Sequence, residues 1–172
     1  MWQTIGHEWA IALLRRATET GRVAHAYLFT GPPQIGKTTL ALDLASALLC
    51  TSDEPPCGVC MSCQRVAQGT HPDVAVVKPD GAPPSAGKIK IDQIRSLQRE
   101  LTLSPHQGAT RRVAVVTEFQ TATSEAANAL LKTLEEPPGR AILLLTATDA
   151  SLLLPTIVSR CQLLPLRALP RQ

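Results

Sequence analysis

A glycine-containing loop near the N-terminus has the spacing of a phosphate-binding loop. The residues Gly31-Pro32-Pro33-Gln34-Ile35-Gly36-Lys37-Thr38 match the pattern G-x-x-x-x-G-K-[ST]. Gly36 would let several backbone N–H groups converge on phosphates at the N-terminus of the next helix. Lys37 would reach the β- and γ-phosphates, and the Thr38 hydroxyl would bind Mg²⁺. The residues predicted to bind the nucleotide are Gly31, Gln34, Ile35, Gly36, Lys37, Thr38 and Thr39.

The alternative for this loop is a glycine-rich turn that carries an exposed lysine. An apolar run precedes the loop and a helical pattern follows it, as the phosphate-binding motif requires. This context favours nucleotide binding.

A second polar position follows the apolar run 113–116, where Thr117 and Glu118 stand side by side. Phosphate-loop ATPases place an Mg²⁺-binding Asp at the end of such a strand, and in many families a Glu that polarises water comes next. Thr117 is neutral, so only one of the two carboxylates is present. We expect ATP to bind and the chain's own hydrolysis to be weak or absent. Glu118 is then a degenerate acidic site or simply a solvated strand-end residue.

Four of the five cysteines lie within fourteen residues, in the pattern C-x₆-C-x₂-C-x₂-C. In a reducing compartment this spacing favours a metal site over disulfides. The thiolates of Cys50, Cys57, Cys60 and Cys63 could converge on one tetrahedral Zn²⁺, with each sulfur about 2.3 Å from the metal. Four sulfurs leave no open position, so the zinc would be structural. Redox chemistry of the C-x-x-C pairs is the alternative, and Cys161 is expected to pack as a small apolar residue.

The elements that must position these residues follow from the apolar pattern. Short apolar runs predict strands at 27–30, 74–77, 113–116 and 142–145, and a weaker fifth strand at 162–166. Helical spacing predicts helices around 10–17, 37–49, 91–101 and 124–134, with Ser124 as a cap. The segment 50–63 is too rich in Cys, Pro and Gly for regular structure, and 78–88 is expected to be an exposed loop. The alternation of strands and helices predicts a three-layer α/β fold around a parallel sheet.

Composition and charge narrow the class of protein. The 172 residues are 44% hydrophobic and 18% charged, which fits one compact domain. A formal net charge of +3 permits contact with nucleic acid but does not argue for it. The chain has no run of 18 apolar residues and no signal-like start, so we expect a soluble, cytoplasmic protein.

Three stretches outside the phosphate loop are distinctive. They are RVAHAYLFTG at 22–31, SEAANALLKTLEEPP at 124–138 and LPTIVSRC at 154–161. Together with the four-cysteine insert, they resemble the AAA+ clamp-loader subunits of bacterial DNA polymerase III, of the gamma and delta-prime type, over nearly the whole chain. The resemblance implies an AAA+ P-loop NTPase domain with a five-stranded parallel sheet over 1–167, including a zinc-binding insert at about 50–63. Residues 168–172 would begin a linker to lid and collar domains.

The resemblance also implies roles for single residues. Thr148 would sense the γ-phosphate at the end of the fourth strand. Arg160, in Ser-Arg-Cys, would act in trans on ATP held by a neighbouring subunit, although its spacing alone would suggest an ordinary surface arginine. Residues 23–27, with Ile5 and Gly6, would border the adenine.

The implied function is that of a delta-prime-like subunit that binds ATP, Mg²⁺ and Zn²⁺ while the sliding clamp is loaded onto primed DNA in replication. Its partners would be gamma/tau- and delta-type subunits, the clamp and primed DNA, with no membrane. The catalytic gamma-type subunits carry Asp-Glu where this chain has Thr117-Glu118, which favours the delta-prime type. The alternatives are a gamma/tau-type catalytic ATPase of the same loader, a free-standing P-loop enzyme such as a small nucleotide kinase, and a zinc-bearing interaction module.

Overall fold

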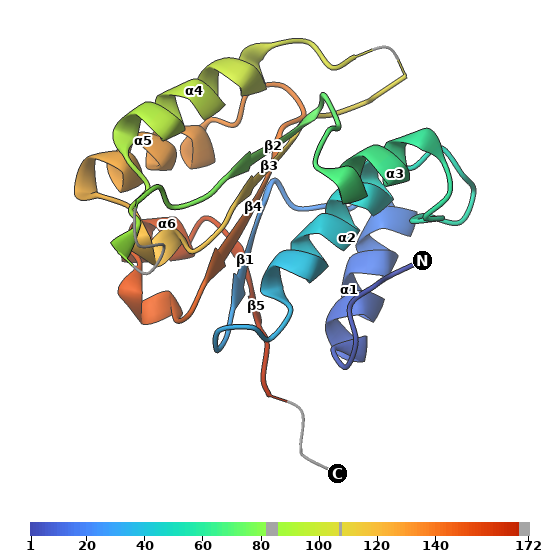
Figure 1. The fold of residues 1–172 in the computed structure, drawn as a ribbon, viewed down its shortest axis with the longest axis horizontal. Helices are drawn as coiled ribbons and strands as arrows, with labels where there is room; N and C mark the ends of the chain where they lie inside the picture. Colours follow the sequence, from blue (N-terminus) through green and yellow to red (C-terminus); the bar gives the residue numbers. More distant parts are fainter. Residues whose placement is uncertain (82–85, 107, 169–172) are drawn as a thin grey trace.

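Five strands form a single sheet in which every neighbouring pair is parallel (Figure 1). We describe it from a computed structural model, which covers residues 1–81, 86–106 and 108–168. The strands are β1 (Ala26–Thr30), β2 (Val74–Val77), β3 (Val113–Val116), β4 (Ile142–Ala147) and β5 (Gln162–Pro165). Their order in the sheet is β2-β3-β4-β1-β5. The predicted five-stranded parallel sheet is confirmed, and the carboxyl ends of its strands meet at one edge.

Helices cover both faces of the sheet, as parallel strands require. They are α1 (Glu8–Glu19), α2 (Lys37–Leu49), α3 (Met61–Gln68), α4 (Ile91–Thr102), α5 (Ser124–Glu135) and the short α6 (Pro155–Val158). Figure 1 shows α1, α2 and α3 on one face and α4, α5 and α6 on the other. The fold is therefore the three-layer α/β arrangement that the sequence predicts.

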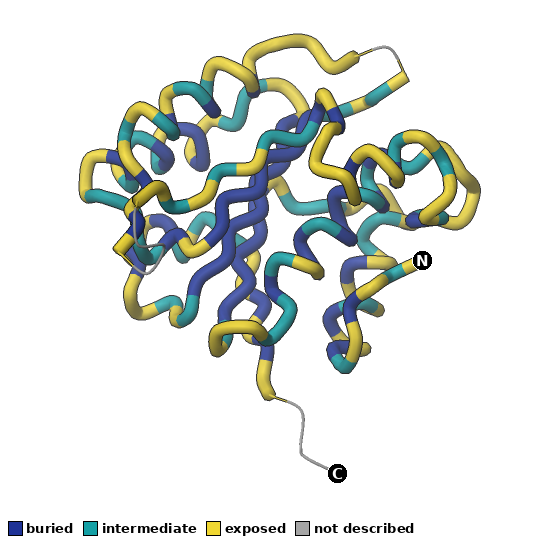
Figure 2. Tube along the Cα trace, viewed as in Figure 1, coloured by how far each residue is buried: buried dark blue, intermediate teal, exposed yellow. Residues whose placement is uncertain are grey.

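The continuous apolar runs of the strands fill two cores at once. Val113 and Val115 pack into the cluster beneath α1 and α2, whereas Ala114 and Val116 pack into the cluster beneath α4 and α5. All four side chains of β3 and all six of β4 are buried, and Figure 2 shows the centre of the sheet as its most continuously buried part. Burial on both faces explains why these strands show no polar alternation.

Two local predictions are wrong. The cysteine segment is not wholly irregular, because α3 begins at Met61 and contains Cys63. Thr123, not Ser124, caps α5, since the Thr123 hydroxyl accepts a hydrogen bond from the N–H of Ala126 at 3.2 Å. Of the loop expected at 78–88, residues 82–85 lie outside the described residues, as do 169–172 of the expected linker.

Among the described residues, no helix combines the length and the apolar character that crossing a bilayer would need.

Candidate nucleotide site and cysteine cluster

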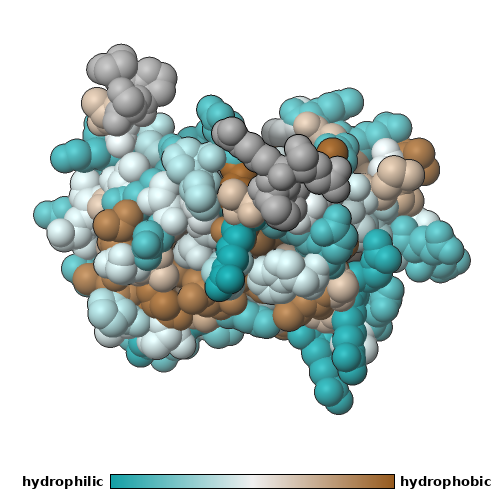
Figure 3. Space-filling model, turned by 90° about the horizontal axis from the view of Figure 1, so that it is seen from below, coloured by the Kyte–Doolittle hydropathy of each residue, from teal (hydrophilic) through white to brown (hydrophobic). Residues whose placement is uncertain are grey.

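The phosphate loop lies between the end of β1 and the start of α2, beside a cavity of about 570 Å³. Gly36 caps α2 with φ of 98°, in the left-handed region that glycine adopts without strain. Figure 3 looks onto this end of the molecule, where hydrophilic side chains project around the rim and a band of hydrophobic surface crosses the lower half. The cavity is lined by Pro33, Gln34, Gly36, Lys37, Thr38, Thr39, Lys78, Thr117, Glu118, Gln120, Thr146, Ala147 and Thr148. The cavity thus brings together the loop and the ends of three other strands.

Lys37 is folded back onto the loop that precedes it. Its Nζ donates hydrogen bonds to the carbonyl oxygens of Gly31 at 2.7 Å and Pro32 at 2.6 Å. Burial lowers the pKa of Lys37, and the nearby charge of Glu118 partly offsets that effect. An incoming phosphate would have to replace these two carbonyls as partner of the ammonium group.

Two of the predicted nucleotide-binding residues, Gly31 and Ile35, do not line the cavity. A Cβ on Gly31 would lie 2.5 Å from the carbonyl oxygen of Leu166, so this glycine allows β5 to pass close to the loop. The carbonyl oxygen of Ile35 lies 3.0 Å from Nε2 of His7, which is buried. His7, which does not line the cavity, therefore contacts the backbone of the loop. No local pattern predicts this contact, because His7 is 28 positions away from its partner.

The acidic position after β3 has the geometry of a sharp turn. Glu118 has φ of 51°, and its N–H donates to the Thr146 hydroxyl at 3.0 Å. Thr117 is buried, and its N–H and hydroxyl both donate to the carbonyl oxygen of Val77, at 2.9 and 3.4 Å. Thr117 therefore faces its neighbouring strand and offers no charged ligand for Mg²⁺.

The end of β4 contributes two threonines to the cavity. Thr148 lines it as expected, and its carbonyl oxygen accepts a hydrogen bond from the N–H of Gly31 at 3.2 Å. Thr146 was missed by the sequence analysis, although it fixes the Glu118 backbone. The residues expected to border the adenine are absent from the lining, and Tyr27 is fully buried in the core, so it cannot contact a ligand.

Arg160 lies outside this cavity, just after α6. Its Nη2 pairs with Oε1 of Glu135 at 3.1 Å, and its Nη1 donates to the carbonyl oxygen of Thr156 at 2.9 Å. The side chain remains about one-third exposed, at 35%. Arg160 is therefore held on the surface by its own chain and is not among the groups around the chain's own phosphate loop.

The four predicted cysteines come together. All four sulfur atoms lie within 4.8 Å of one another, and the sulfurs of Cys50 and Cys60 are 3.9 Å apart. Sulfurs at the corners of a zinc-centred tetrahedron would be separated by about 3.8 Å, whereas a disulfide needs about 2.05 Å. The spacing of this cluster fits four thiolates around one metal ion.

The pKa values of the thiols differ within the cluster. Burial alone would raise the pKa of Cys60. Hydrogen bonds to Cys60 from the backbone and side chains of Thr51 and Cys63 have the larger combined effect and lower this pKa to about 6. Burial raises the pKa of Cys63 to about 12. Cys161 lies apart from the cluster, packs against the core beneath α5, and has its pKa raised by burial to about 12. It is thus the small apolar residue that was expected.

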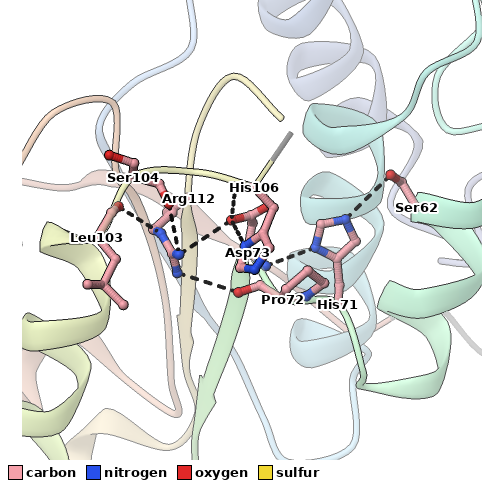
Figure 4. A network of polar contacts seen from close by, with 8 residues as sticks. All are labelled: Ser62, His71, Pro72, Asp73, Leu103, Ser104, His106 and Arg112. Atoms are coloured by element: carbon pink, nitrogen blue, oxygen red, sulfur yellow. Dashed lines mark hydrogen bonds and ion pairs between the residues drawn. The ribbon is translucent and has the colours of Figure 1, made fainter. Parts of the chain in front are cut away.

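A second polar cluster lies at the amino ends of β2 and β3, at the end of the sheet opposite the phosphate loop (Figure 4). Its centre is the buried Asp73, whose Oδ1 accepts the N–H of His106 at 3.0 Å and lies 3.6 Å from Nη2 of Arg112. Arg112 also donates to the carbonyl oxygens of Leu103 and Ser104, at 2.9 and 3.1 Å. These contacts join the segment after α4 to the starts of both strands.

The same cluster contains a serine, a histidine and an aspartate, but not in catalytic order. Nε2 of His71 lies 3.4 Å from the Ser62 hydroxyl, and Nδ1 accepts the backbone N–H of Asp73 at 3.1 Å. Since Nδ1 is an acceptor, the proton of neutral His71 is on Nε2, which therefore donates to Ser62 and cannot act as its base. His71 therefore has a structural role: its two ring nitrogens connect Ser62 of α3 to the backbone just before β2.

The family model of DNA polymerase III, delta subunit, matches residues 6–170. The subunit delta' of Pseudomonas aeruginosa is 42% identical over 157 residues, covering 90% of this chain and 47% of the relative. The gamma/tau subunit of Mycobacterium tuberculosis is 39% identical over 170 residues, covering 98% of this chain and 28% of the relative. The chain spans about half the length of the delta' relatives that it matches.

Solved structures are similar over nearly the whole chain. A DNA polymerase III gamma subunit-related protein of Thermotoga maritima has a TM-score of 0.67 at 27% identity, covering 94% of this chain and 46% of that structure. The RuvB Holliday junction branch migration motor of the same organism has a TM-score of 0.60 at 22% identity, covering 95% and 45%. The latter likeness concerns the fold alone.

Proposed function

Because this chain belongs to the DNA polymerase III delta subunit family, we propose that it is the nucleotide-binding part of a delta-prime-like clamp-loader subunit, acting in the cytoplasm. The observation that supports this most directly is the phosphate loop beside a cavity in which Thr117 replaces the usual aspartate. Such a site can hold ATP through backbone N–H groups, Lys37 and Thr38. It lacks the carboxylate that would keep Mg²⁺ in place for hydrolysis.

In this proposal, Arg160 serves the ATP site of a neighbouring subunit. Arg160 is not among the residues that line the chain's own cavity, its side chain is partly exposed, and a planar guanidinium can stabilise charge on a transferring γ-phosphate. Thr148 and Glu118 would report on nucleotide within the chain's own site. Gamma/tau- and delta-type subunits, the sliding clamp and primed DNA are the proposed partners.

Nucleotide binding can be tested on the chain alone by thermal unfolding. MgATP at 100 times its Kd should stabilise the native state by about 2.7 kcal/mol, because it binds only that state. Lys37→Ala should abolish the shift and leave the domain folded, although its ligand-free melting temperature should fall somewhat with the loss of the hydrogen bonds to Gly31 and Pro32. The matched control is Lys132→Ala, an exposed lysine on α5 outside the cavity. An equal shift in the Lys37 variant would place the nucleotide elsewhere, and no shift in the wild type would favour an interaction module.

The trans role of Arg160 requires the assembled loader. Arg160→Ala in the intact subunit should leave its own ATP binding unchanged and slow clamp- and DNA-stimulated hydrolysis by the assembly. Such arginines contribute about 10³–10⁵ in rate in the best-studied cases, and we expect a smaller effect in a motor with several sites. Arg99→Ala, on the exposed face of α4, is the control. Wild-type loading by the Arg160 variant would rule out this role.

A gamma/tau-type ATPase is the second candidate, because Glu118 is retained and relatives of that type match nearly the whole chain. It predicts substantial ATP hydrolysis by the subunit's own site. If the subunit hydrolyses ATP weakly and Thr117→Asp raises its turnover, the missing aspartate accounts for the weak hydrolysis. Unchanged turnover in this variant would contradict that explanation.

We also propose that the cysteine cluster holds one structural Zn²⁺. The distances fit a closed tetrahedral site, which would supply binding and no open position for catalysis. Elemental analysis should find close to one zinc per chain. A folded chain with four free thiols and no metal would contradict the proposal.

A further inference from the structure

The cavity beside the phosphate loop contains a second lysine, Lys78, which the motif does not include. Among the described residues, the charged side chains that line the cavity are Lys37, Lys78 and Glu118. Lys78 directly follows β2, and two strands, β3 and β4, lie between β2 and β1, the strand that leads into the phosphate loop. Sequence spacing gave no reason to connect it with the loop, because only the topology brings the two together.

The backbone around Lys78 is fixed, so the fold places the root of its side chain at the cavity. The register pairs Val77 with Val116, which sets Lys78 beside Thr117. The N–H of Thr117 donates to the carbonyl oxygen of Val77 at 2.9 Å, and Nε2 of Gln93 donates to that of Lys78 at 2.8 Å. Contacts from β3 and from α4 thus hold the chain immediately before and at Lys78.

The charge of Lys78 is not used within the described part of the chain. No carboxylate there lies within ion-pair distance of its Nζ, in contrast to Arg112, Arg160 and Arg95, which all have acidic partners. The side chain is exposed and lies on the wall that Thr117 shares. A cation is therefore available next to the position where other P-loop proteins hold Mg²⁺ by an aspartate.

We propose that Lys78 is a second phosphate-binding residue, which supplies positive charge where Thr117 cannot hold Mg²⁺. The phosphates of a nucleoside triphosphate would then lie between two ammonium groups, Lys37 from the loop and Lys78 from β2. Binding would depend less on Mg²⁺ than it does in a P-loop protein with the aspartate. This inference rests on the proposed binding of nucleotide at the loop.

The test is a titration of the full chain with ATP, once with excess Mg²⁺ and once in Mg²⁺-free buffer without a chelator, which leaves the cysteine cluster undisturbed. We expect wild-type Kd values within about threefold of each other, since the second cation belongs to the protein. Lys78→Ala should weaken binding without Mg²⁺ by about tenfold or more, the size of one lost charge-assisted hydrogen bond. Lys78→Arg should keep most of the affinity, and Lys132→Ala should match the wild type.

Thr117→Asp gives an independent arm of the same experiment. The introduced carboxylate should bind Mg²⁺ and repel bare triphosphate, so the affinity of this variant should fall without Mg²⁺ and recover when Mg²⁺ is added. Adding Lys78→Ala to it should cost little when Mg²⁺ is present, because the metal then supplies the charge. A double variant that still loses about tenfold with Mg²⁺ would contradict the substitution of lysine for metal.

The outcomes separate this inference from the proposed function. If the wild type binds no ATP under either condition, nucleotide binding itself is wrong, and the role of Lys78 falls with it. If the wild type binds and Lys37→Ala does not, but Lys78→Ala binds like the wild type without Mg²⁺, only the role of Lys78 is overturned. A Lys78→Arg variant as weak as Lys78→Ala would also overturn it, since the charge is retained.

Discussion

At the scale of single residues, Gly31 and Gly36 both have positive φ, of 148° and 98°, but their surroundings differ. A Cβ on Gly31 would meet the backbone of Leu166, whereas a Cβ on Gly36 would meet no protein atom within 4 Å. Gly31 is required by packing inside the protein. Gly36 is required because its backbone is in the left-handed region, and its lack of a side chain keeps the N-terminus of α2 open to a ligand.

This difference predicts opposite phenotypes for two alanine variants. Gly31→Ala should lower the free energy of unfolding by about 2–5 kcal/mol, because strain and a backbone clash add together. Gly36→Ala should cost only about 1–2 kcal/mol of strain but should weaken ATP binding more than Gly31→Ala does. Urea denaturation and ATP titration of both variants check the ranking. Equal losses of stability would contradict it.

His71 makes the stability of the protein depend on pH. Burial lowers its pKa, with the charge of Asp73 opposing and the charges of Arg65 and His106 adding to the effect. The unfolded chain, with a pKa of about 6.5 at this histidine, then binds a proton more readily than the folded one. Stability is therefore complete above about pH 6.5 and is lost as the pH falls from there through the lowered folded pKa.

The measurement is the midpoint of urea denaturation between about pH 7.5 and pH 5. The wild type should lose stability on acidification, and His71→Gln should reduce that loss, because glutamine can keep a donor and an acceptor without taking up a proton. An unchanged slope in the variant would assign the pH dependence to other groups.

At the scale of elements, the sequence predicted best where one signal decided the structure. The runs at 74–77 and 113–116 match β2 and β3 to the residue. The central strand β3 is buried and therefore apolar on both faces, and the edge strand β2 is only partly buried but is equally apolar in sequence. The helix α3 was missed, since its first turn, with the buried Cys63, falls in the segment 50–63, which is rich in Cys, Gly and Pro. The metal-ligand spacing of the cysteines and the first turn of α3 overlap at Cys60 and Cys63, so the cysteine spacing obscures the helical pattern.

The candidate site was predicted only in part, for a related reason. The residues next to each other in the phosphate-loop motif were identified, and five of the seven line the cavity. His7, Lys78 and Thr146 were not identified, because each reaches the site through the order of strands or the return of the N-terminus. Strand order is a property of the whole sheet, and no local pattern in this sequence encodes it.

The helix α3 should depend on metal more than the sheet does. Cys60 caps α3 and Cys63 lies in its first turn, so removal of the proposed Zn²⁺ should release the helix at its N-terminus. With a strong chelator, amide exchange should accelerate in 50–68 and stay slow in β3 and β4. Cys60→Ser should give the same pattern without chelator, and Cys161→Ala, outside the cluster, should not. Global unfolding on chelation would show that the insert is not a separate unit.

At the scale of the whole molecule, Arg112 and Asp73 connect parts of the chain that are 39 positions apart. Both side chains are buried, with exposures of 8% and 1%. Loss of one partner of a buried pair typically costs about 3–5 kcal/mol, because the other charge stays desolvated. Against a domain stability of about 5–15 kcal/mol, this pair affects the global transition and not only a loop.

Arg112→Met should therefore lower the melting temperature by about 6–20 °C, since about 2–4 °C corresponds to 1 kcal/mol for a chain of this size. Adding Asp73→Leu should restore part of that loss, because the unpaired carboxylate is then gone. Arg99→Met, at an exposed position of α4, is the control. A double variant as unstable as the sum of the single ones would mean that the two residues act independently.

The exit of the chain beside the phosphate loop has a mechanical consequence. The edge strand β5 pairs with β1 alone, and the N–H of Leu166 donates to the carbonyl oxygen of Thr30 at 2.7 Å, one residue before Gly31. The chain leaves β5 along the strand direction (Figure 1), so a pull on Ala168 loads the β1–β5 hydrogen bonds in shear, all together. Single-molecule stretching through Ala168 should give a higher rupture force with ATP bound than without it. Force applied at Ala168 is transmitted through β5 to Thr30, the residue before the phosphate loop. The rupture force of the β1–β5 pair should therefore depend on whether nucleotide is bound.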